Sequence, residues 1–517
     1  MPSHPGHVFV VPGRLDLLDC DDVVVPTDHS VHVTRTWTST LDWGSAPVRR
    51  AERGAVTSLS DQRRVAQLPE RTGRRRWLLS VGHGGGDIEA LADGLQQCLR
   101  AIASTQMLGD RSVRRVGLPT LGVGQGGYGG KRGEVIRALL ETATGLAQEL
   151  GMDVVFVAYN PADYSAFQSE RRKAGDMLSA EQETLARALA ERAKSGELAL
   201  FMGAGTSMSA GLPSWNGLLA ALAARVDLPF DAAAWDRLGP LDAAELLRRR
   251  AADVHHGEEG ALGWLVSEII APKKRYGLTH VQLAALHCEQ AITTNFDHLY
   301  EDAVAAVDGR RPLVVLPGGK SRELAGTSSA GWLLKLHGDV SAPASVVLAR
   351  RSFVTYDAQR RPLGGVLQST LLTKHLLVVG ASMTDDNVIR LIHEVAELGE
   401  RSHGSATELG TVISLQRDDL RQQIWKPEFA YLALGERNGD VGRAARELEV
   451  FLDRVVLLSE TGQAHLISER YAPLLGTDAE RRAAASARHL HEEIAGLGGE
   501  GWSALRAALE QFGADPT

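Results

Sequence analysis

The 517-residue sequence is poor in cysteine and has no long apolar run. Its three cysteines, Cys20, Cys98 and Cys288, lie far apart and form no Cys-x-x-Cys pair. This spacing excludes a zinc ribbon and a disulfide framework, and free thiols fit a reducing cytoplasm. No apolar run approaches about 18 residues, and the N-terminal stretch lacks a basic region followed by a long apolar segment. We therefore expect no membrane span, no signal peptide and a cytoplasmic location.

The sequence also lacks an excess of positive charge. Lysine and arginine number 56 against 64 aspartate and glutamate residues, which gives a formal net charge of -8. Because phosphate contacts need a positive surface, this balance argues against broad nucleic-acid binding. One local exception is the stretch 49–76, in which nine arginines accompany three acidic residues. We interpret it as a solvated basic loop, and a phosphate or partner contact is the alternative.

Strand and helix patterns alternate through residues 1–170. Short valine-rich runs predict strands, and two stretches with apolar residues at helical spacing predict helices between them. The expected strands are 7–11, 22–26, 77–81, 115–119 and 153–159, and the expected helices are 88–104 and 132–149. Such alternation is typical of a layered α/β domain. Residues 171–195 are expected to form a linker and a helix that Ser179 and Gln182 open as a capping box.

A second α/β domain is predicted over residues 196–455. Its expected strands are continuous apolar runs, as in parallel strands covered on both faces. They are 197–202, 289–294, 312–316, 332–336, 345–349, 375–380 and 410–415. The mainly helical stretch at about 215–287 is too long for a simple crossover, so it predicts a helical lobe inserted beside the sheet. Residues 456–517 are expected to form a helical C-terminal region.

A glycine-rich loop follows the first strand of this second domain. In LALFMGAGTSMSAGLPSW, an apolar strand runs into Gly203-Ala204-Gly205 and then into hydroxyl residues. Strand, glycine turn and helix form a geometry that binds phosphate, because backbone N–H groups and the helix dipole attract an anion and glycine lacks an obstructing Cβ. The alternative is a close-packed turn without a ligand.

Three more expected strands end in polar clusters. ITTNFD ends at Asp297, KLHGD ends at Asp339, and VGASMTDDN ends at Asn387. In a doubly wound sheet, ligands bind beyond the carboxyl ends of the strands. All four clusters occupy that kind of position, so we expect them to surround one ligand cavity.

The four motifs GAGTSMSAGLPSW, TTNFD, KLHGD and GASMTDDN resemble the SIR2-like (sirtuin) domain, and more closely the bacterial SIR2-like domains of phage-defence proteins, which consume NAD+. The resemblance covers about residues 190–400 and implies a Rossmann-like fold. It implies that NAD+, as the substrate, is bound by Gly203, Ala204, Gly205, Ser207, Pro213, Trp215, Thr294, Gly380, Ser382 and Asn387. It places catalysis on Asn295, His337 and Asp297, and no metal is expected.

The chemistry of NAD+ cleavage explains these residue types. Breaking the nicotinamide–ribose bond builds positive charge on the ribose carbon, as in glycoside hydrolysis, and the neutral leaving group needs no proton. Asn295 can hold a water or a ribose hydroxyl, and His337 can accept its proton, since histidine titrates near about pH 6.5. Asp297 is expected to hold the nicotinamide amide. The alternatives are helix caps for Asp297 and Asn387, and a structural role for His337.

The sequence departs from protein-deacetylating sirtuins, which generally carry a four-cysteine zinc module. Three scattered cysteines cannot build one, and no acyl-lysine channel signature is evident. We therefore expect an NAD+ hydrolase that depletes NAD+ in bacterial antiphage defence (abortive infection), with an NAD-dependent protein deacylase or a non-catalytic nucleotide-binding scaffold as alternatives. Because an always-active enzyme would kill its host, we expect regulation through a homo-oligomer, a nucleotide signal or a partner protein of the same defence system.

The N-terminal domain contains a second glycine-rich loop. RVGLPTLGVGQGGY, together with GRLDLLDCDDVVVP and DVVFVAYNPADYSAF, resembles the macro domain, a layered module that binds ADP-ribose. The resemblance covers about residues 7–170 and implies a three-layer domain. It implies an ADP-ribose-type ligand at Gly122, Gly124, Gly126, Gly127 and Tyr128. Arg14 stands where an acidic residue is usual, and residues 26–29 (PTDH) replace an Asn-rich loop, so a scaffold without a ligand is the alternative.

Overall fold

The computed structural model describes residues 5–515, except 57–58, 72, 83–86, 110, 125, 176–177, 255–259, 317–330 and 404–407. The chain divides into two compact units. The first contains Met1–Leu178 and Glu460–Thr517, and the second contains Ser179–Ser459. In the part of the chain that the structure describes, no helix is long and apolar enough to cross a membrane.

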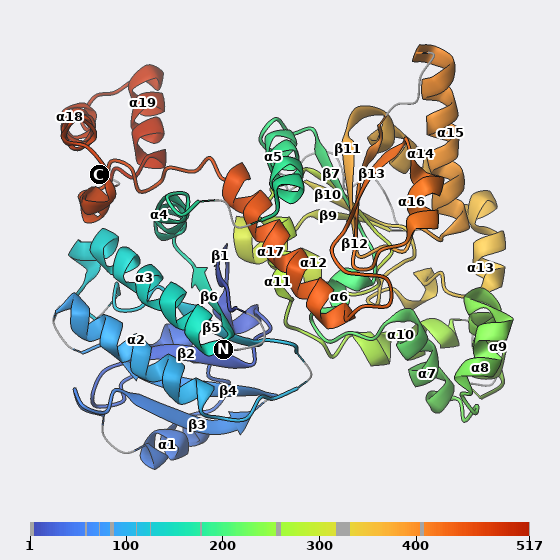
Figure 1. Ribbon diagram of the computed structural model, residues 1–517, viewed down its shortest axis with the longest axis horizontal. Helices are drawn as coiled ribbons and strands as arrows, with labels where there is room; N and C mark the ends of the chain where they lie inside the picture. Colours follow the sequence, from blue (N-terminus) through green and yellow to red (C-terminus); the bar gives the residue numbers. More distant parts are fainter. Residues whose placement is uncertain are drawn as a thin grey trace. The chain divides into compact units, whose positions relative to one another are not determined.

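The first unit is built on a six-stranded sheet of order β1-β6-β5-β2-β4-β3 (Figure 1). Neighbouring strands are parallel, apart from β3, which pairs antiparallel with β4. The strands are β1 (Val8–Pro12), β2 (Asp22–Thr27), β3 (Val65–Arg71), β4 (Arg74–Ser80), β5 (Arg114–Pro119) and β6 (Met152–Ala158). The helices are α1 (Ala46–Ala55), α2 (Ile88–Ala103), α3 (Arg132–Leu150) and α4 (Pro161–Arg171).

Both faces of this sheet are covered. Val24 and Leu79 belong to a hydrophobic core that includes residues of α2 and α3. Val25 and Leu78 belong to a second core, which includes Trp43. Because successive residues of a strand face opposite sides of the sheet, the two cores lie on opposite faces. The predicted three-layer α/β architecture of this domain is therefore confirmed.

The arginine-rich stretch is only partly solvated, because its last three arginines are buried. Arg74 and Arg76 lie in β4 with 1% and 0% exposure. Arg76 donates to both carboxylate oxygens of Glu52 on α1, at 3.0 and 3.1 Å, and Arg74 donates to the Thr40 carbonyl at 2.6 Å. Charged groups this deep need such partners. For these buried arginines the sequence interpretation was wrong, because composition cannot show that an acidic residue 24 positions earlier folds back onto the strand.

The C-terminal region packs on the first unit. Tyr471, in the 3-10 helix Glu469–Leu474, donates a 2.6 Å hydrogen bond to Asp163 on α4. A Cβ added to Gly133 on α3 would lie 3.0 Å from Leu474, so this segment touches the backbone of α3. The helices that follow are α18 (Asp478–Ile494) and α19 (Glu500–Gln511). Residues 456–517, predicted as a region of their own, thus return to the first unit from position 460 onward.

The second unit contains a seven-stranded parallel sheet of order β13-β12-β11-β7-β8-β10-β9 (Figure 1). From β7 the chain first adds β8, β9 and β10 toward one edge of the sheet, and then adds β11, β12 and β13 toward the other edge. The strands are β7 (Leu198–Met202), β8 (Gln290–Thr293), β9 (Leu313–Val315), β10 (Trp332–Lys335), β11 (His375–Val379), β12 (Gly410–Ser414) and β13 (Phe429–Ala433). The predicted doubly wound class is confirmed, and its switch point lies between β7 and β11, where such sheets bind ligands.

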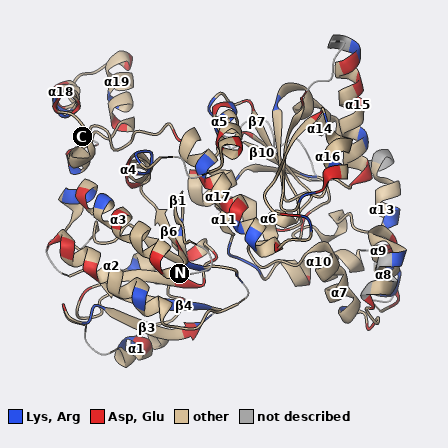
Figure 2. Ribbon diagram, viewed as in Figure 1, with Lys and Arg blue, Asp and Glu red and all other residues tan. Residues whose placement is uncertain are grey.

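Helices cover this sheet on both sides, and Figure 1 shows one group on each side. The first group is α5 (Ala180–Lys194), α11 (Leu278–Ala284), α12 (Leu299–Asp308) and α17 (Val441–Ser459), and the second is α14 (Tyr356–Thr373), α15 (Asp386–His403) and α16 (Asp419–Trp425). Figure 2 shows acidic and basic residues mixed along outer helices such as α5 and α15. The predicted capping box of α5 is present, with Ser179 and Gln182 bonding each other's backbone N–H.

The predicted helical lobe between β7 and β8 is also confirmed. It consists of α7 (Trp215–Arg225), α8 (Ala232–Leu238), α9 (Pro240–Val254) and α10 (Ala261–Ile270), which share an apolar core. The predicted strand at 345–349 is wrong. Leu348 and Ala349 are buried in the lobe core, and the Val347 N–H donates to the His337 carbonyl, so this apolar run packs between the lobe and a sheet loop instead of pairing with a strand.

Candidate active site

A cavity of about 420 Å³ lies at the carboxyl ends of β7, β8, β10 and β11, against the helical lobe. Small-molecule sites typically occupy about 300–1,000 Å³. Most of the expected site residues line it: Gly203, Ala204, Ser207, Pro213, Trp215, Thr294, Asn295, Asp297, His337, Gly380 and Ser382. Gly205 and Asn387 are not among its lining residues. Four motifs that are distant in the sequence therefore meet at one cavity.

The glycines of the loop after β7 allow it to touch the loop after β11. A Cβ on Gly203 would lie 2.5 Å from the Ala381 Cα, and a Cβ on Gly205 would lie 2.8 Å from the Gly380 Cα. The Gly205 N–H donates to the Gly380 carbonyl at 2.9 Å. That N–H is used within the protein, so Gly205 serves the close packing of two loops, the alternative that the sequence left open. Gly203 and Ala204 remain in the cavity wall.

Asn295 follows β8, and its amide is held in one orientation. Its Nδ2 donates to the Gly203 carbonyl at 3.0 Å and to the hydroxyl oxygens of Thr206 and Ser207 at 3.1 Å. Because a carbonyl oxygen can only accept, the amide nitrogen must face Gly203. The other amide atom, Oδ1, is buried and has no hydrogen-bond partner among the described residues. Asn295 therefore keeps one acceptor for a water or hydroxyl of a bound ligand.

Ser207 connects Asn295 to a histidine that the sequence analysis did not identify. Nδ1 of His280 accepts a hydrogen bond from the Gly277 N–H at 3.2 Å, which places the ring proton on Nε2. That Nε2 lies 3.2 Å from the Ser207 hydroxyl, which in turn donates to Asp297 Oδ2 at 2.8 Å. Ser207 is 2% exposed, and its hydroxyl is fully engaged. The hydroxyl thus orients Asn295. It is not free to contact the phosphate of NAD+, the role that the resemblance implied for Ser207.

Asp297 lines the cavity and also caps a helix. Its Oδ1 accepts from the Leu299 N–H in the first turn of α12 at 2.9 Å, and its Oδ2 accepts from Ser207. His298 occupies the N-cap position of α12, so Asp297 holds the first turn of the helix from the residue before that position. A carboxylate offers about four lone-pair sites, so this cap leaves acceptor capacity toward the cavity.

His337 pairs with Asp385, which stood unassigned inside the VGASMTDDN motif. The distance from His337 Nε2 to Asp385 Oδ2 is 2.7 Å. Asp385 Oδ1 accepts from the N–H groups of Asn387 and Val388 at 2.9 and 3.2 Å, so Asp385 rather than Asn387 caps α15. Burial alone would raise the pKa of Asp385, but the His337 contact and these N–H groups lower it. An ionised carboxylate therefore orients the imidazole at the cavity wall.

The helical lobe supplies an apolar wall, of which the sequence analysis identified only Pro213 and Trp215. Leu212, Leu218 and Ile270 line the cavity on this side, and the Phe353 ring of α13 (Arg350–Val354) packs edge-on against His337 with ring centres 5.2 Å apart. In the sequence, such residues are indistinguishable from an ordinary helix core. The expected residues Pro213 and Trp215 also belong to this wall.

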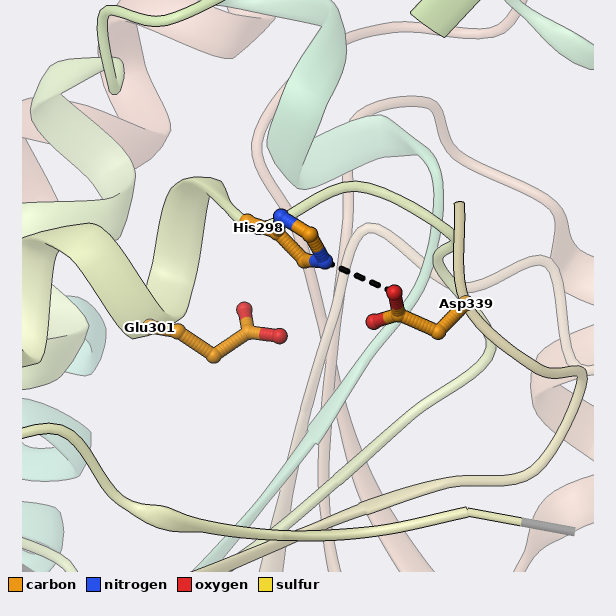
Figure 3. Close-up of side chains that lie close together, drawn as sticks. All are labelled: His298, Glu301 and Asp339. Atoms are coloured by element: carbon orange, nitrogen blue, oxygen red, sulfur yellow. Dashed lines mark hydrogen bonds and ion pairs between the residues drawn. The ribbon is translucent and has the colours of Figure 1, made fainter. Parts of the chain in front are cut away.

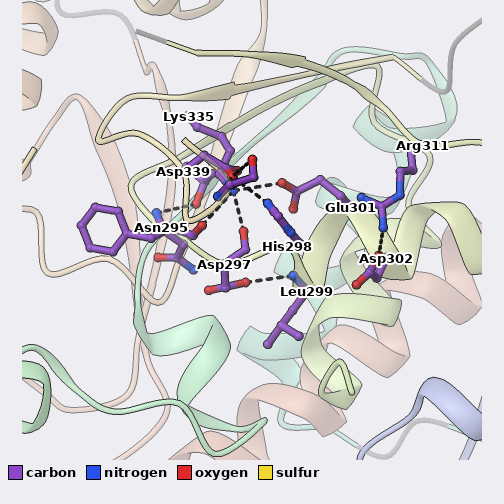
Figure 4. Close-up of polar contacts among 12 residues, drawn as sticks. Asn295, Asp297, His298, Leu299, Glu301, Asp302, Arg311, Lys335 and Asp339 are labelled. Carbon is purple, nitrogen blue, oxygen red and sulfur yellow. Dashed lines mark hydrogen bonds and ion pairs between the residues drawn. The ribbon is translucent and has the colours of Figure 1, made fainter. Parts of the chain in front are cut away.

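A second polar cluster adjoins the loop of Asn295. His298, Glu301 and Asp339 each bring one potential ligand atom within 4.8 Å of the others (Figure 3). His298 Nε2 lies 2.7 Å from Asp339 Oδ1. The ammonium of Lys335 contacts Glu301 at 3.0 Å and Asp339 at 2.5 Å (Figure 4). The arrangement resembles a metal site, but a lysine supplies the cation.

The glycine-rich loop of the first unit folds on itself. Gly122 and Gly127 have φ angles of +77° and +87°, which favour glycine. A Cβ on Gly122 would lie 2.9 Å from the Tyr128 ring, and one on Gly126 would lie 2.7 Å from the Gly122 carbonyl oxygen. Tyr128 is 2% exposed, whereas Gly124 has open space at its Cβ position. The loop's own packing accounts for these glycines, and the ligand implied there stays a prediction.

Comparison with known proteins bears on the second unit. Residues 289–431, which include Asn295, His337 and Gly380, match the family model of the SIR2-like domain. The chain carries a SIR2-like domain. The resemblance is confirmed over these residues, which contain three of the four motifs, and they supply part of the lining of the cavity described above.

Curated relatives are similar to part of this chain. NAD(+) hydrolase ThsA of Enterococcus faecium is 29% identical over 219 residues, which are 42% of this chain and 43% of that protein. NAD(+) hydrolase ThsA of Bacillus cereus is 27% identical over 205 residues, 39% of this chain and 40% of that protein. Defense-associated sirtuin 2 of Bacillus subtilis is 26% identical over 219 residues, 41% of this chain and 21% of that protein. The chain thus covers less than half the length of these relatives.

Two solved structures of a Trypanosoma brucei macrodomain are also similar to part of the chain. The structure in complex with ADP has 17% identity and a TM-score of 0.26, and the likeness covers 32% of this chain and 71% of the macrodomain chain. The other has 15% identity and a TM-score of 0.27, with 33% and 67% covered. Scores this low carry no argument about a ligand of the first unit.

Proposed function

We propose that the protein is an NAD+ glycohydrolase that cleaves NAD+ with water to nicotinamide, ADP-ribose and a proton. The observation that carries this proposal is that Asn295 and His337 line one cavity, with the buried Asn295 Oδ1 left without a partner among the described residues. The SIR2-like domain and the relatives named NAD(+) hydrolase support the choice of substrate.

The reaction breaks the bond between the nicotinamide nitrogen and ribose C1′ and forms a bond from C1′ to a water oxygen. Asn295 Oδ1 accepts a hydrogen bond from this water or from a ribose hydroxyl and so fixes its position. His337, oriented by Asp385, accepts the proton released as water attacks. The bonding electrons of the broken bond leave with nicotinamide, which departs as a neutral molecule.

The charge of the cavity suits this transition state. Its lining residues include the carboxylates Asp297, Asp385 and Asp386, and no lysine or arginine among the described residues lines it. Negative charge near C1′ favours the cationic nicotinamide ring of the substrate and the positive charge that develops on the ribose. The apolar wall of the lobe excludes water from the nicotinamide ring, so that the carboxylates act in a site of low dielectric constant.

The test is to incubate the purified full chain with NAD+ and to separate the products. We expect nicotinamide and ADP-ribose, and we expect Asn295→Ala and His337→Ala each to lower kcat at least about 100-fold. The matched controls are Asn387→Ala, outside the cavity, and His489→Ala, whose side chain is 71% exposed on α18. An acyl-ADP-ribose product formed only with an acylated peptide would indicate a deacylase, and binding without turnover would indicate a scaffold.

We propose that this activity serves to deplete NAD+ in antiphage defence, which the name of the Bacillus subtilis relative supports. The first unit would then sense a nucleotide of the ADP-ribose type at Gly122, Gly124, Gly126, Gly127 and Tyr128, or dock a partner protein, and the active form would be a homo-oligomer. A rise in thermal stability of the first unit with ADP-ribose, lost in Gly124→Trp, tests the sensor. Light scattering before and after activation tests the oligomer.

A further inference from the structure

Lys335 is a fully buried lysine at the end of β10, two residues before His337. Its ammonium contacts Glu301 at 3.0 Å, Asp339 at 2.5 Å, and the backbone carbonyl oxygens of Asp297 and, at 3.3 Å, Phe296 (Figure 4). An ammonium has three protons, and the three closer oxygens match them. All the hydrogen-bonding capacity of this cation is therefore directed at fixed points of the surrounding loops.

These points belong to both catalytic loops. Phe296 and Asp297 directly follow Asn295, and Asp339 lies two residues after His337. The Lys335 ammonium thus joins the loop after β8 to the loop after β10. Glu301 adds a tie to α12, the helix that Asp297 caps.

Lys335 offsets part of the negative charge of this cluster. Burial alone would lower the pKa of Lys335, but Glu301, Asp339 and Asp297 raise it, so the group is charged at neutral pH. Asp339 also accepts from His298 and from the Ser341 N–H. The His298–Glu301–Asp339 cluster of Figure 3 therefore holds a positive charge of the chain itself.

We propose that Lys335 is a positioning residue for NAD+ cleavage, whose ammonium sets the placement of Asn295 relative to His337. This inference rests on the proposed function. Lys335 does not line the cavity, so it acts through the two loops. A misplacement of reacting groups by about 1 Å lowers the rate about 100-fold, and substrate contacts elsewhere in the cavity are unaffected.

If Lys335 had only a structural role, kcat would recover together with the stability of the fold once the charge imbalance is removed. In Lys335→Met, two buried carboxylates lose their common cation, and the fold itself loses stability. In the double variant Lys335→Met/Glu301→Gln, Asp339 is the one of these two carboxylates that remains charged, and it keeps His298 and the Ser341 N–H as partners. The double variant therefore separates the balance of charge from the geometry of the loops.

The experiment compares kcat, KM and the unfolding midpoint Tm of the full-length wild type, both variants and the control Lys374→Met. Lys374 Nζ donates to the Gly196 carbonyl, at the opposite end of the sheet from the cavity. We expect the double variant to recover most of the Tm lost in Lys335→Met. Its kcat is expected to stay about 100-fold low with KM within about threefold of wild type.

A double variant that recovers kcat together with Tm would overturn the proposal, and so would a Lys335→Met variant with the wild-type kcat. Wild-type protein that releases no nicotinamide would instead refute the proposed function, and the positioning role with it. The two failures are thus distinguishable, because the first requires an active wild type.

Discussion

Replacement of Asn295 by Asp tests the orientation deduced for the Asn295 amide, because it changes a single heavy atom of the side chain. The change exchanges Nδ2 for an oxygen and keeps the size of the side chain. Nδ2 lies 3.0 Å from the Gly203 carbonyl oxygen and 3.1 Å from the hydroxyl oxygens of Thr206 and Ser207. Neither hydroxyl can turn to donate without losing another bond, because Thr206 donates to Gly203 and Ser207 donates to Asp297. An oxygen at this place would face three other oxygens.

The magnitude follows from these contacts. Two donated protons are lost, at about 1 kcal/mol each, and a partly buried carboxylate without donors adds about 1–3 kcal/mol. The free energy of unfolding should fall by about 3–5 kcal/mol, which corresponds to a decrease in Tm of roughly 10 °C for a domain of this size. Asn295→Ala loses the same donors but introduces no oxygen, so its decrease should be about half as large.

Thermal unfolding at neutral pH, with nicotinamide release measured in parallel, checks this order. Both variants should lose nicotinamide release, and Tm should fall in the order wild type, Asn295→Ala, Asn295→Asp. The matched control is Asn387→Asp in the first turn of α15, where an added carboxylate faces a helix N-terminus and should change Tm by no more than about 2 °C. If Asn295→Asp proves as stable as Asn295→Ala, the deduced orientation of the amide is wrong.

Three further changes probe the surroundings of the amide. Ser207→Ala removes an acceptor of Asn295 and should lower kcat about tenfold while KM stays within about twofold, as steady-state kinetics would show. Gly380→Ala places a Cβ 2.4 Å from the Thr206 nitrogen at a φ of +67°, so Tm should fall by several degrees and NAD+ affinity should fall in calorimetry. The pKa of Asp385 is lowered in the folded protein, so its stabilising contribution is present above about pH 4 and is lost as pH falls through the folded-state value. The Asp385→Asn variant should therefore lose less stability than wild type between about pH 5 and pH 3 in unfolding titrations, and equal slopes would contradict the assigned shift.

Much of the candidate site was predictable because strand ends are encoded locally. An apolar run followed by glycine or by polar residues marks where a buried strand stops. In a parallel sheet these stops gather at one edge. The loop of Gly203 and the polar clusters that contain Asn295 and His337 were identified in this way. The resemblance to the SIR2-like domain then singled out Asn295 and His337, and the structure places all three residues in one cavity. Local signals also gave the capping box of α5 and the helical lobe.

Local signals misled where backbone pairing competes with burial. The run 345–349 is as apolar as a strand, but its side chains are buried against the lobe, and one of its N–H groups bonds a loop carbonyl. At β3 the sequence analysis missed a strand. It is an edge strand, and its exposed residues and Pro69 obscure the alternation of the buried Ala66 and Leu68 with exposed positions. An edge strand needs only one buried face, so its pattern is weak.

By itself, the sequence determined the two α/β domains, the order of the motifs and the residue types of the site, because these depend on periodicity and turns within a few residues. Only the tertiary structure decided which distant groups pair. His280 reaches Ser207 across 73 positions, and Tyr471 reaches Asp163 across 308. Lys335 takes oxygen partners from two loops and a helix. A buried polar group must find its partner wherever the packed chain brings one close, and that proximity has no local signature in the sequence.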